Sequence, residues 1–344
     1  MNRPLSAPRM IEEARATGKG HRGFVEVLIF LLVFLVAQSL LSIPVGIASV
    51  AWVFSSDAFA EIISEFVETQ NFDAYMESIM ALVTGGMPDW LMTVQLFSTA
   101  LTTLTAILFC RWFEKRTPAT MGLRKSHAVR EYLIGALIGI ALISVCVGLC
   151  AAFGGLTLST ATFSVGMWLL YLVGFFIQGM SEEVLCRGYL MVSLSRRGSM
   201  VAAVLTNSLV FGLLHLVNPG FGLLPLLNIT LFGILLSIYV LRRGNLWGAC
   251  AIHSLWNFFQ GNVFGISVSG TGTGASPLSA TLDEGLAILN GGTFGIEGGL
   301  VVTLVLAVAT VLVFFLLPKK PDEHEIAPAA PTDTSVGTDY IASV

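Results

Sequence analysis

Residues 163–193 read FSVGMWLLYLVGFFIQGMSEEVLCRGYLMVS, and most of them are apolar. A helix that crosses a bilayer needs about 20 mostly apolar residues, and this run is longer than that. It contains Glu182, Glu183 and Arg187. Charged side chains inside a membrane are energetically costly and usually mark function. The stretch therefore predicts a membrane-spanning helix that carries chemistry.

The composition of the whole chain also favours a membrane protein. Of its 344 residues, 55% are hydrophobic and 12% are charged, and the mean hydropathy is +0.81. Typical soluble domains carry about 25% charged residues. A soluble core could not cover so much apolar surface, so we expect the lipid bilayer to surround much of the chain. The formal net charge of −4 argues against nucleic acid as a partner.

Eight apolar segments predict an all-α integral membrane protein with eight transmembrane helices. The first is too long for the core of a signal peptide and has no clear cleavage site, so we expect it to be retained. The segments are 24–53, 91–110, 132–153, 163–193, 199–217, 222–241, 246–265 and 299–317.

Lys and Arg predict the orientation of these helices, because basic residues collect in cytoplasmic segments. Seventeen of the 18 basic residues lie in the N-terminal tail, in the loops after helices two, four and six, or after helix eight. Arg187 is the remaining one. The opposite loops contain no Lys or Arg, and we therefore expect both termini in the cytoplasm. These outside loops are 54–90, 154–162, 218–221 and 266–298.

The chain divides into five predicted regions. Loop 54–90 contains seven acids and apolar residues at helical spacing, which predicts one or two short helices on the outer surface. We interpret it as a solvated acidic cap, with a substrate lid as the alternative. Loop 266–298 is rich in Gly, Ser and Thr and is predicted to be flexible. The regions are a basic cytoplasmic tail (1–23), helices one and two (24–129), a core (130–265), an outside loop with helix eight (266–317) and a disordered cytoplasmic tail (318–344).

The acids of helix four have different expected surroundings. Glu183 and Arg187 are four residues apart, so they share a helix face and can pair. Glu182 is offset from Glu183 by about 100°, has no local partner and is available for chemistry. It lies 14 residues before Arg196, which is about 21 Å along a helix and near mid-membrane. A buried ion pair that only fixes packing is the alternative, but two adjacent carboxylates beside one Arg weaken it.

Two other helices carry polar residues at similar depth. Counted from the nearest Arg pairs, His215 lies about 27 Å deep, His253 about 15 Å and Asn257 about 21 Å. Each alone could serve helix packing through hydrogen bonds. Taken together with the acids, they predict a polar active-site cavity formed by helices four, five and seven.

These groups suit the hydrolysis of a peptide bond. A carboxylate and a histidine can hold and deprotonate water, and a second histidine with an asparagine can donate hydrogen bonds to an oxyanion. Zinc bound by Glu182, His215 and His253 is the alternative, although the H-E-x-x-H pattern is absent. No other cofactor is indicated. The five cysteines show no metal or redox spacing, and we expect free thiols.

Three motifs resemble those of the CAAX protease and bacteriocin-processing (Abi) family, which includes the Ras-converting prenyl-protein endopeptidase. They are Glu182-Glu183-x-x-x-Arg187, Phe211-x-x-x-His215 and His253-x-x-x-Asn257, within residues 130–265. The resemblance implies an eight-helix core and a catalytic Glu182 assisted by His215. It also implies that Glu183 and Arg187 support Glu182, that His253 and Asn257 form the oxyanion site, and that Phe211 packs near the catalytic histidine.

The most consistent function is an intramembrane endopeptidase that cleaves a membrane-associated peptide or protein. A non-proteolytic regulator or immunity protein of the same fold is the alternative. A proton-coupled transporter is disfavoured because no internal duplication is visible. The compact chain indicates a bacterial cytoplasmic membrane. The substrate, the cleavage site, the side of substrate entry and the oligomeric state stay open.

Overall fold

The computed structural model describes residues 7–18, 20–84, 88–272 and 274–318. The predicted disordered tail lies almost wholly outside these residues. Within the described ranges, five helical stretches are long and apolar enough to cross a membrane, and two further apolar helices are shorter. The protein is therefore a multi-pass α-helical membrane protein, while the count of eight spans and the orientation remain predictions. The five stretches are Gly23–Ser55, Asp89–Trp112, Ala128–Ala152, Val165–Arg197 and Leu223–Arg243.

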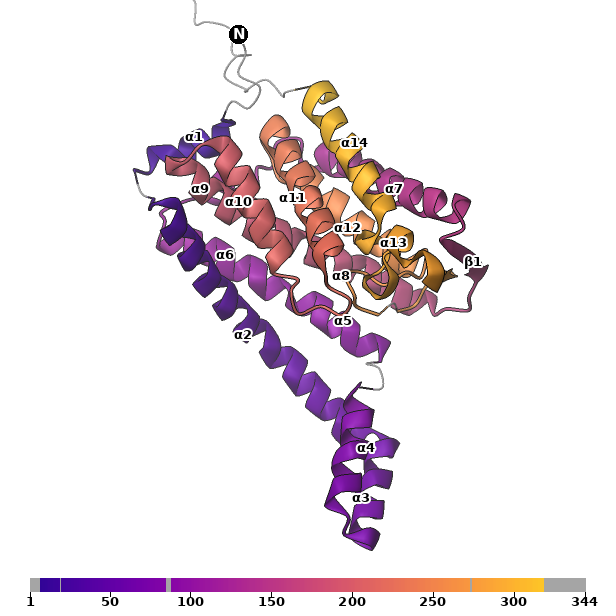
Figure 1. The fold of residues 1–344 in the computed structure, drawn as a ribbon. Helices are drawn as coiled ribbons and strands as arrows, with labels where there is room; N and C mark the ends of the chain where they lie inside the picture. Colours follow the sequence, from indigo (N-terminus) through magenta and orange to yellow (C-terminus); the bar gives the residue numbers. More distant parts are fainter. Residues whose placement is uncertain (1–6, 19, 85–87, 273, 319–344) are drawn as a thin grey trace, which may run out of the picture.

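Each of the eight predicted segments contains helical structure (Figure 1). The fourth is not a uniform α-helix, because its middle part, η2, is a π-helix in which hydrogen bonds reach five residues back instead of four. The corresponding elements are α2 (Gly23–Ser55), α5 (Asp89–Ser98) with α6 (Ala100–Trp112), α7 (Ala128–Ala152), α8 (Val165–Glu183) continuing through η2 (Val184–Met191) into α9 (Val192–Arg197), α10 (Met200–Leu213), α11 (Leu223–Arg243), α12 (Trp247–Asn262) and α14 (Leu300–Leu316).

Glycines allow α12 to pack closely between α7 and α8. A Cβ atom on Gly135 of α7 would lie only 2.2 Å from the carbonyl oxygen of Gly248. One on Gly179 of α8 would lie 2.4 Å from the hydroxyl oxygen of Ser254. Small residues at such crossings let membrane helices approach closely. These contacts fix α12, which carries His253 and Asn257, against the helix that carries the acids.

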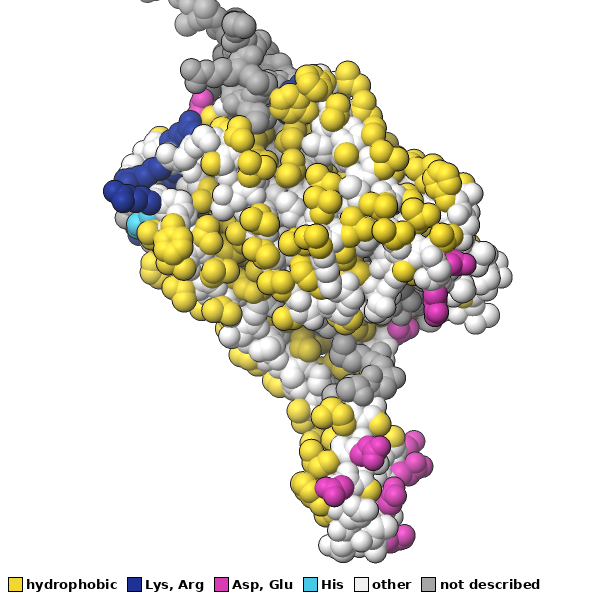
Figure 2. All heavy atoms as spheres, viewed as in Figure 1, with side chains coloured by type: hydrophobic (Ala, Val, Ile, Leu, Met, Phe, Trp, Pro, Cys, Tyr) yellow, Lys and Arg dark blue, Asp and Glu magenta, His cyan; other side chains and the backbone are white. Residues whose placement is uncertain are grey.

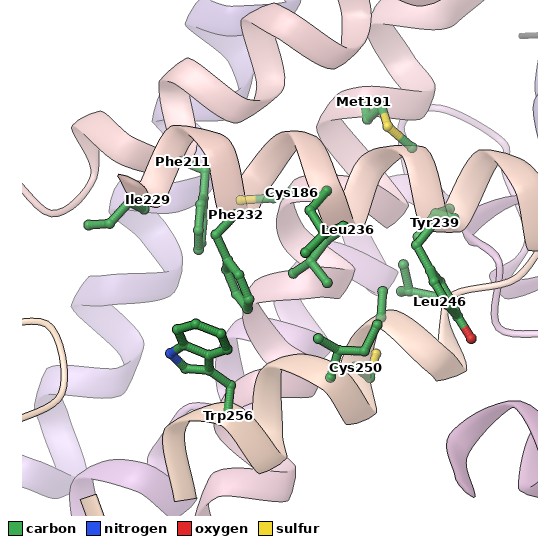
Figure 3. Close-up of a cluster of buried hydrophobic side chains, with 14 of the residues drawn as sticks. Cys186, Met191, Phe211, Ile229, Phe232, Leu236, Tyr239, Leu246, Cys250 and Trp256 are labelled. Carbon is green, nitrogen blue, oxygen red and sulfur yellow. The ribbon is translucent and has the colours of Figure 1, made fainter. Parts of the chain in front are cut away.

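The opposite side of α12 packs against α11 through large apolar side chains. Phe232 and Leu236 of α11 point toward Trp256 and Cys250 of α12, while Tyr239 points toward the start of α12 near Leu246 (Figure 3). All of these side chains are buried. All five cysteines of the chain are buried and free, which confirms the expectation of free thiols. The core therefore holds α12 from three sides.

The described residues of loop 266–298 form ordered structure, so the expectation of flexibility is wrong for them. Strand β2 (Leu278–Leu282) pairs antiparallel with β1 (Leu156–Thr160), with Leu156 opposite Leu282. Phe294 and Ile296 are fully buried. The loop also contains η3 (Glu284–Leu286), α13 (Ala287–Asn290), η4 (Gly292–Phe294) and η5 (Ile296–Gly298).

The glycines of this loop shape turns. Gly291 and Gly295 have φ angles of +82° and +90°, which residues other than glycine rarely adopt. Asn290 directly precedes Gly291. Its side-chain amide donates hydrogen bonds to the carbonyl oxygens of Gly155 and Asp283, each at 2.7 Å. A composition that favoured flexibility thus belongs to a tightly turned segment that packs on the core.

Loop 54–90 contains two short helices, as predicted, but their placement differs from the expectation. Helices α3 (Asp57–Thr69) and α4 (Phe72–Thr84) form a hairpin that projects beyond the end of α2 and away from the helical body (Figure 1). Acidic side chains gather on one side of this hairpin (Figure 2). Phe66 contacts Tyr75 at 4.9 Å between ring centres, while other apolar side chains of the hairpin, such as Val67, Phe72 and Met80, are exposed.

The predicted N-terminal tail contains a helix, α1 (Arg9–Ala16), whose residues Met10, Ile11 and Ala14 are buried. It packs against α9, and Arg15 donates to the carbonyl oxygen of Ser195 at 2.9 Å. Most of the Lys and Arg side chains visible in Figure 2 lie at this end of the molecule. The gathering of the basic segments at one end is compatible with the predicted orientation.

Candidate active site

Glu183 and Arg187 form a buried ion pair across the junction of α8 and η2. Arg187 Nη1 donates to Glu183 Oε1 at 2.8 Å, and neither side chain is exposed. The guanidinium carbon of Arg187 lies 4.3 Å from the ring centre of Phe211 in α10, which is a cation–π contact. The pairing that the four-residue spacing predicts is therefore present, and Phe211 packs directly on it.

His253 lies between the two glutamates. Its Nδ1 is 2.8 Å from Glu183 Oε1, and its Nε2 is 3.6 Å from Glu182 Oε2. Because an ionised carboxylate can only accept, we assign a proton to Nδ1, and this hydrogen bond directs Nε2 toward Glu182. The rings of Phe211 and Phe232 lie 5.9 and 5.4 Å from the imidazole. The histidine is thus fixed by its hydrogen bond to Glu183 and by aromatic neighbours.

Gln178 is a site residue that the motifs did not reveal. Its Nε2 donates to Glu182 Oε1 at 2.5 Å, and its Oε1 accepts from Asn257 Nδ2 at 3.1 Å. The expectation that Glu182 has no local partner is therefore wrong. A signal was available, because Gln178 is an amide in an apolar helix one turn before Glu182, where the two side chains can meet. It links the catalytic candidate to α12.

Asn257 is held beside this pair and faces the cavity described below. It is 5% exposed, and its amide donates to Gln178 rather than to an acid. It lies one turn after His253 on the same face of α12, as the sequence spacing predicts. His253 and Asn257 thus both contact α8, the helix that carries the acids, one helical turn apart.

His215 lies just beyond the end of α10 and is half-buried. Its Nδ1 is 2.9 Å from the carbonyl oxygen of Phe211. A carbonyl can only accept, so we assign the proton to Nδ1, which leaves Nε2 unprotonated in the neutral ring and able to accept a proton. The ring also makes an edge contact with Phe211 at 5.1 Å. Within the described part of the chain, no hydrogen bond or ion pair joins His215 to Glu182.

A cavity of about 320 Å³ brings the predicted residues together. Its wall includes Glu182, His215, His253 and Asn257, together with Gln178. Glu183 and Arg187 lie fully buried next to His253 and Phe211 rather than on the wall. The helices predicted to form the cavity contribute to it. Further wall residues come from α2, α5, α6, α11, the loop before β2, η5 and α14.

The zinc alternative requires Glu182, His215 and His253 to converge. Glu182 and His253 are close, and the bond from His215 Nδ1 to the Phe211 carbonyl leaves the Nε2 of His215 available to a metal. Among the described residues, no group of three His, Cys, Asp or Glu side chains is arranged to hold a metal ion. The residues present therefore do not fit this ligand set in the conformation of the structure.

Glu297 is a second carboxylate on the cavity wall, contributed by the loop that was expected to be flexible. It accepts from Trp256 Nε1 at 3.1 Å, from the Ser269 amide at 2.7 Å and from the Ser269 hydroxyl at 2.9 Å. Sequence motifs gave no indication of Glu297, because it is distant from α12 along the chain and only the folded structure brings the two together. These contacts attach the loop to the residue directly before Asn257.

Comparison with known proteins points to one family. Residues 164–259 match the model of the type II CAAX prenyl endopeptidase Rce1-like family. No curated protein and no solved structure matches the chain. The matched region runs from the start of α8 into α12 and contains all seven predicted site residues. The matched region supplies the acids and histidines of the cavity. Residues 164–259 are thus similar to a family of membrane endopeptidases.

Proposed function

We propose that the protein is an intramembrane endopeptidase in which Glu182 activates water for attack on a peptide bond. The observation that carries the proposal is the setting of Glu182 on the cavity wall. One of its oxygens is held by Gln178, and the other, which has no hydrogen-bond partner among the described residues, faces His253 Nε2 at 3.6 Å. A carboxylate that is oriented but not neutralised can serve as a general base.

The reaction follows from this placement. Glu182 takes a proton from water as the water oxygen forms a bond to the carbonyl carbon of the peptide. The tetrahedral intermediate then collapses, the carbon–nitrogen bond breaks, and the leaving amine receives the proton from Glu182. His215, whose Nε2 is able to accept, assists the removal of the proton from water. Each of these groups lines the same cavity.

The other residues orient the base and stabilise the charge that develops. Asn257 would donate a hydrogen bond to the oxyanion, and His253 would do so through Nε2 when both of its ring nitrogens carry protons. Such bonds lower the energy of the intermediate. His253 is held by Glu183, and Glu183 by Arg187, so this chain of contacts fixes the donor before substrate binds. Preorganised donors of this kind contribute more to catalysis than donors that must first be reoriented.

The proposed substrate is a membrane-associated peptide or protein, cleaved in the cytoplasmic membrane of a bacterium. The cavity wall supports this class of substrate, because it combines the polar catalytic group with apolar residues from α2, α5 and α14 such as Phe34, Met92 and Val302. A segment that leaves the bilayer could bury its apolar side chains there while its peptide bond reaches Glu182.

Membrane proteomics tests the proposal without knowledge of the substrate. Cells with the wild-type protein are compared with cells that carry Glu182→Ala, and Glu284→Ala serves as the control because it removes an exposed acid that does not line the cavity. We expect uncut precursors to accumulate only with Glu182→Ala. An unchanged set of membrane peptides in all three strains would favour the non-proteolytic regulator.

A further inference from the structure

Arg116 is a buried arginine that none of the catalytic motifs contains. It follows α6 and precedes the 3₁₀ turn η1 (Pro118–Met121). Its side chain is fully buried, and its Nη1 donates to Glu114 Oε2 at 2.8 Å. Because a buried ion pair adds little net stability by itself, the remaining contacts of Arg116 decide what it contributes.

Those contacts reach the end of the π-helix and the turn after it. Arg116 Nη2 donates to the carbonyl oxygen of Gly188 at 2.7 Å. Its Nη1 donates to the Ser193 hydroxyl at 2.9 Å and lies 3.4 Å from the carbonyl oxygen of Tyr189. Gly188 directly follows Arg187 in the chain. One guanidinium therefore contacts the backbone next to a member of the proposed active site.

The winding of η2 sets how Glu183 and Arg187 face each other. Glu183 is the last residue of α8 and Arg187 lies inside η2, so their ion pair spans the point where the winding changes. At the far end, the Val192 N–H reaches the Tyr189 carbonyl only three residues back, so the winding changes again there. A shift of one residue between α and π winding rotates a side chain by about 100°.

Turn η1, which follows Arg116 in the chain, also packs closely against the backbone of η2. A Cβ atom on Gly188 would lie 3.1 Å from the carbonyl oxygen of Met121, which shows how closely the two segments approach. Arg116 also contacts the hydroxyl and the carbonyl of Thr120, each at 3.4 Å. The segment from Glu114 to Met121 thus contacts the C-terminal part of η2 through the hydrogen bonds of Arg116 and through direct packing.

We infer that Arg116 is a positioning residue that maintains the π winding of η2 and thereby orients Arg187, Glu183 and His253. This inference rests on the proposed function, since it concerns the same site. Arg116 would do so through directional hydrogen bonds from its planar guanidinium to two backbone carbonyl oxygens. A lysine in its place keeps the charge next to Glu114 but offers a point charge without the fixed geometry of those bonds.

Arg196 provides a matched control. Its Nη1 lies 3.2 Å from the same Glu114 oxygen, and its Nη2 donates to Thr17. Among the described residues it forms no hydrogen bond to a carbonyl of η2. Arg196→Lys therefore perturbs the same ion-pair group without touching the backbone of the π-helix.

The experiment compares Arg116→Lys and Arg196→Lys in the full chain, purified in detergent. Three quantities are measured: kcat and KM for a transmembrane reporter peptide, the melting temperature, and amide hydrogen exchange in residues 184–193. We expect Arg116→Lys to lower kcat about tenfold to a hundredfold, as small misplacements of catalytic groups do. KM should change by less than about twofold on the same argument, and exchange in 184–193 should become faster. Arg196→Lys should leave kcat and this exchange unchanged.

Each other outcome has a defined meaning. If Arg116→Lys keeps wild-type kcat and exchange, or if Arg196→Lys has equal effects, the inference is wrong. A lower melting temperature with unchanged kcat per folded molecule would show a merely structural role. Should Arg116→Lys fail to fold, Ser193→Ala removes one acceptor of Arg116 and should lower kcat several-fold; an unchanged kcat would overturn the inference. If the wild type cleaves no peptide, the proposed function fails, and the exchange data alone decide whether Arg116 holds the winding.

Discussion

Glu182 and Glu183 are adjacent in the chain but have different surroundings. Glu183 is completely buried and bonded to both Arg187 and His253, whereas the side chain of Glu182 is 30% exposed and lines the cavity. The offset of about 100° between neighbours on a helix accounts for this division. The two carboxylates should therefore respond differently to the same substitution.

Glu183→Gln should destabilise the protein as well as reduce its activity. The substitution leaves the fully buried Arg187 without its anion, and breaking a buried pair in this way typically destabilises a protein by about 3–5 kcal/mol. The measurement is the melting temperature in detergent, with Glu284→Gln as the exposed control. A Glu183→Gln variant that is fully stable yet inactive would mean that the two glutamates have exchanged roles.

Cleavage should persist after exhaustive treatment with a chelator, because the proposed mechanism uses only protein groups and water. The measurement is the rate at which purified protein cuts a reporter peptide before and after chelation. Activity that disappears with the chelator and returns with zinc would support the metal mechanism, and would require His215 to move toward Glu182 and His253.

At the scale of elements, the crossing of α7 and α12 determines where His253 lies. Gly135→Ala should lower both melting temperature and activity, because its Cβ would lie 2.2 Å from the Gly248 carbonyl and must push the helices apart. Overpacking of this kind typically destabilises by about 1–3 kcal/mol. Gly148→Ala on the same helix is the control, since its Cβ would meet no atom within 4 Å. Equal behaviour of the two variants would contradict this account of the packing.

Some elements could be predicted from the sequence and others could not. The length of the apolar runs and the spacing of Glu183 and Arg187 reflect local helix geometry. The helices and this ion pair could therefore be predicted from the sequence. The π winding of η2 was not, because it depends on contacts such as those of Arg116, which is separated from Gly188 by 72 positions. The same reason applies to Glu297, and glycine-rich composition gave the wrong answer for loop 266–298 because its glycines form turns.

At the scale of the whole molecule, the orientation predicted from Lys and Arg can be tested by labelling. Single cysteines at Ser64, on the projecting hairpin, and at Ser126, before α7, are both at exposed positions. A membrane-impermeant thiol reagent should label the first from outside and the second only after the membrane is opened. The native cysteines should not interfere because all five are buried. Labelling of Ser126→Cys in intact cells would reverse the orientation.

The arrangement of the described segments agrees with this orientation. Strands β1 and β2 join two loops predicted to lie outside, and the Arg243–Glu131 pair joins two segments predicted to lie inside. The positive-inside rule concerns only the distribution of basic residues over loops. It can predict the orientation, but not the pairing of the two strands or of Arg243 with Glu131. The number of membrane crossings stays a prediction, since α10, α12 and α14 fall below the length or hydropathy of a clear span.

A paired measurement on Glu182→Gln decides whether Glu182 is the base. The amide preserves the size of the side chain but cannot accept the proton of water. The melting temperature in detergent and the cleavage rate of a transmembrane reporter peptide are determined on the same preparation. We expect a melting temperature close to that of the wild type and no detectable cleavage. Cleavage at the wild-type rate by a folded Glu182→Gln protein would contradict it.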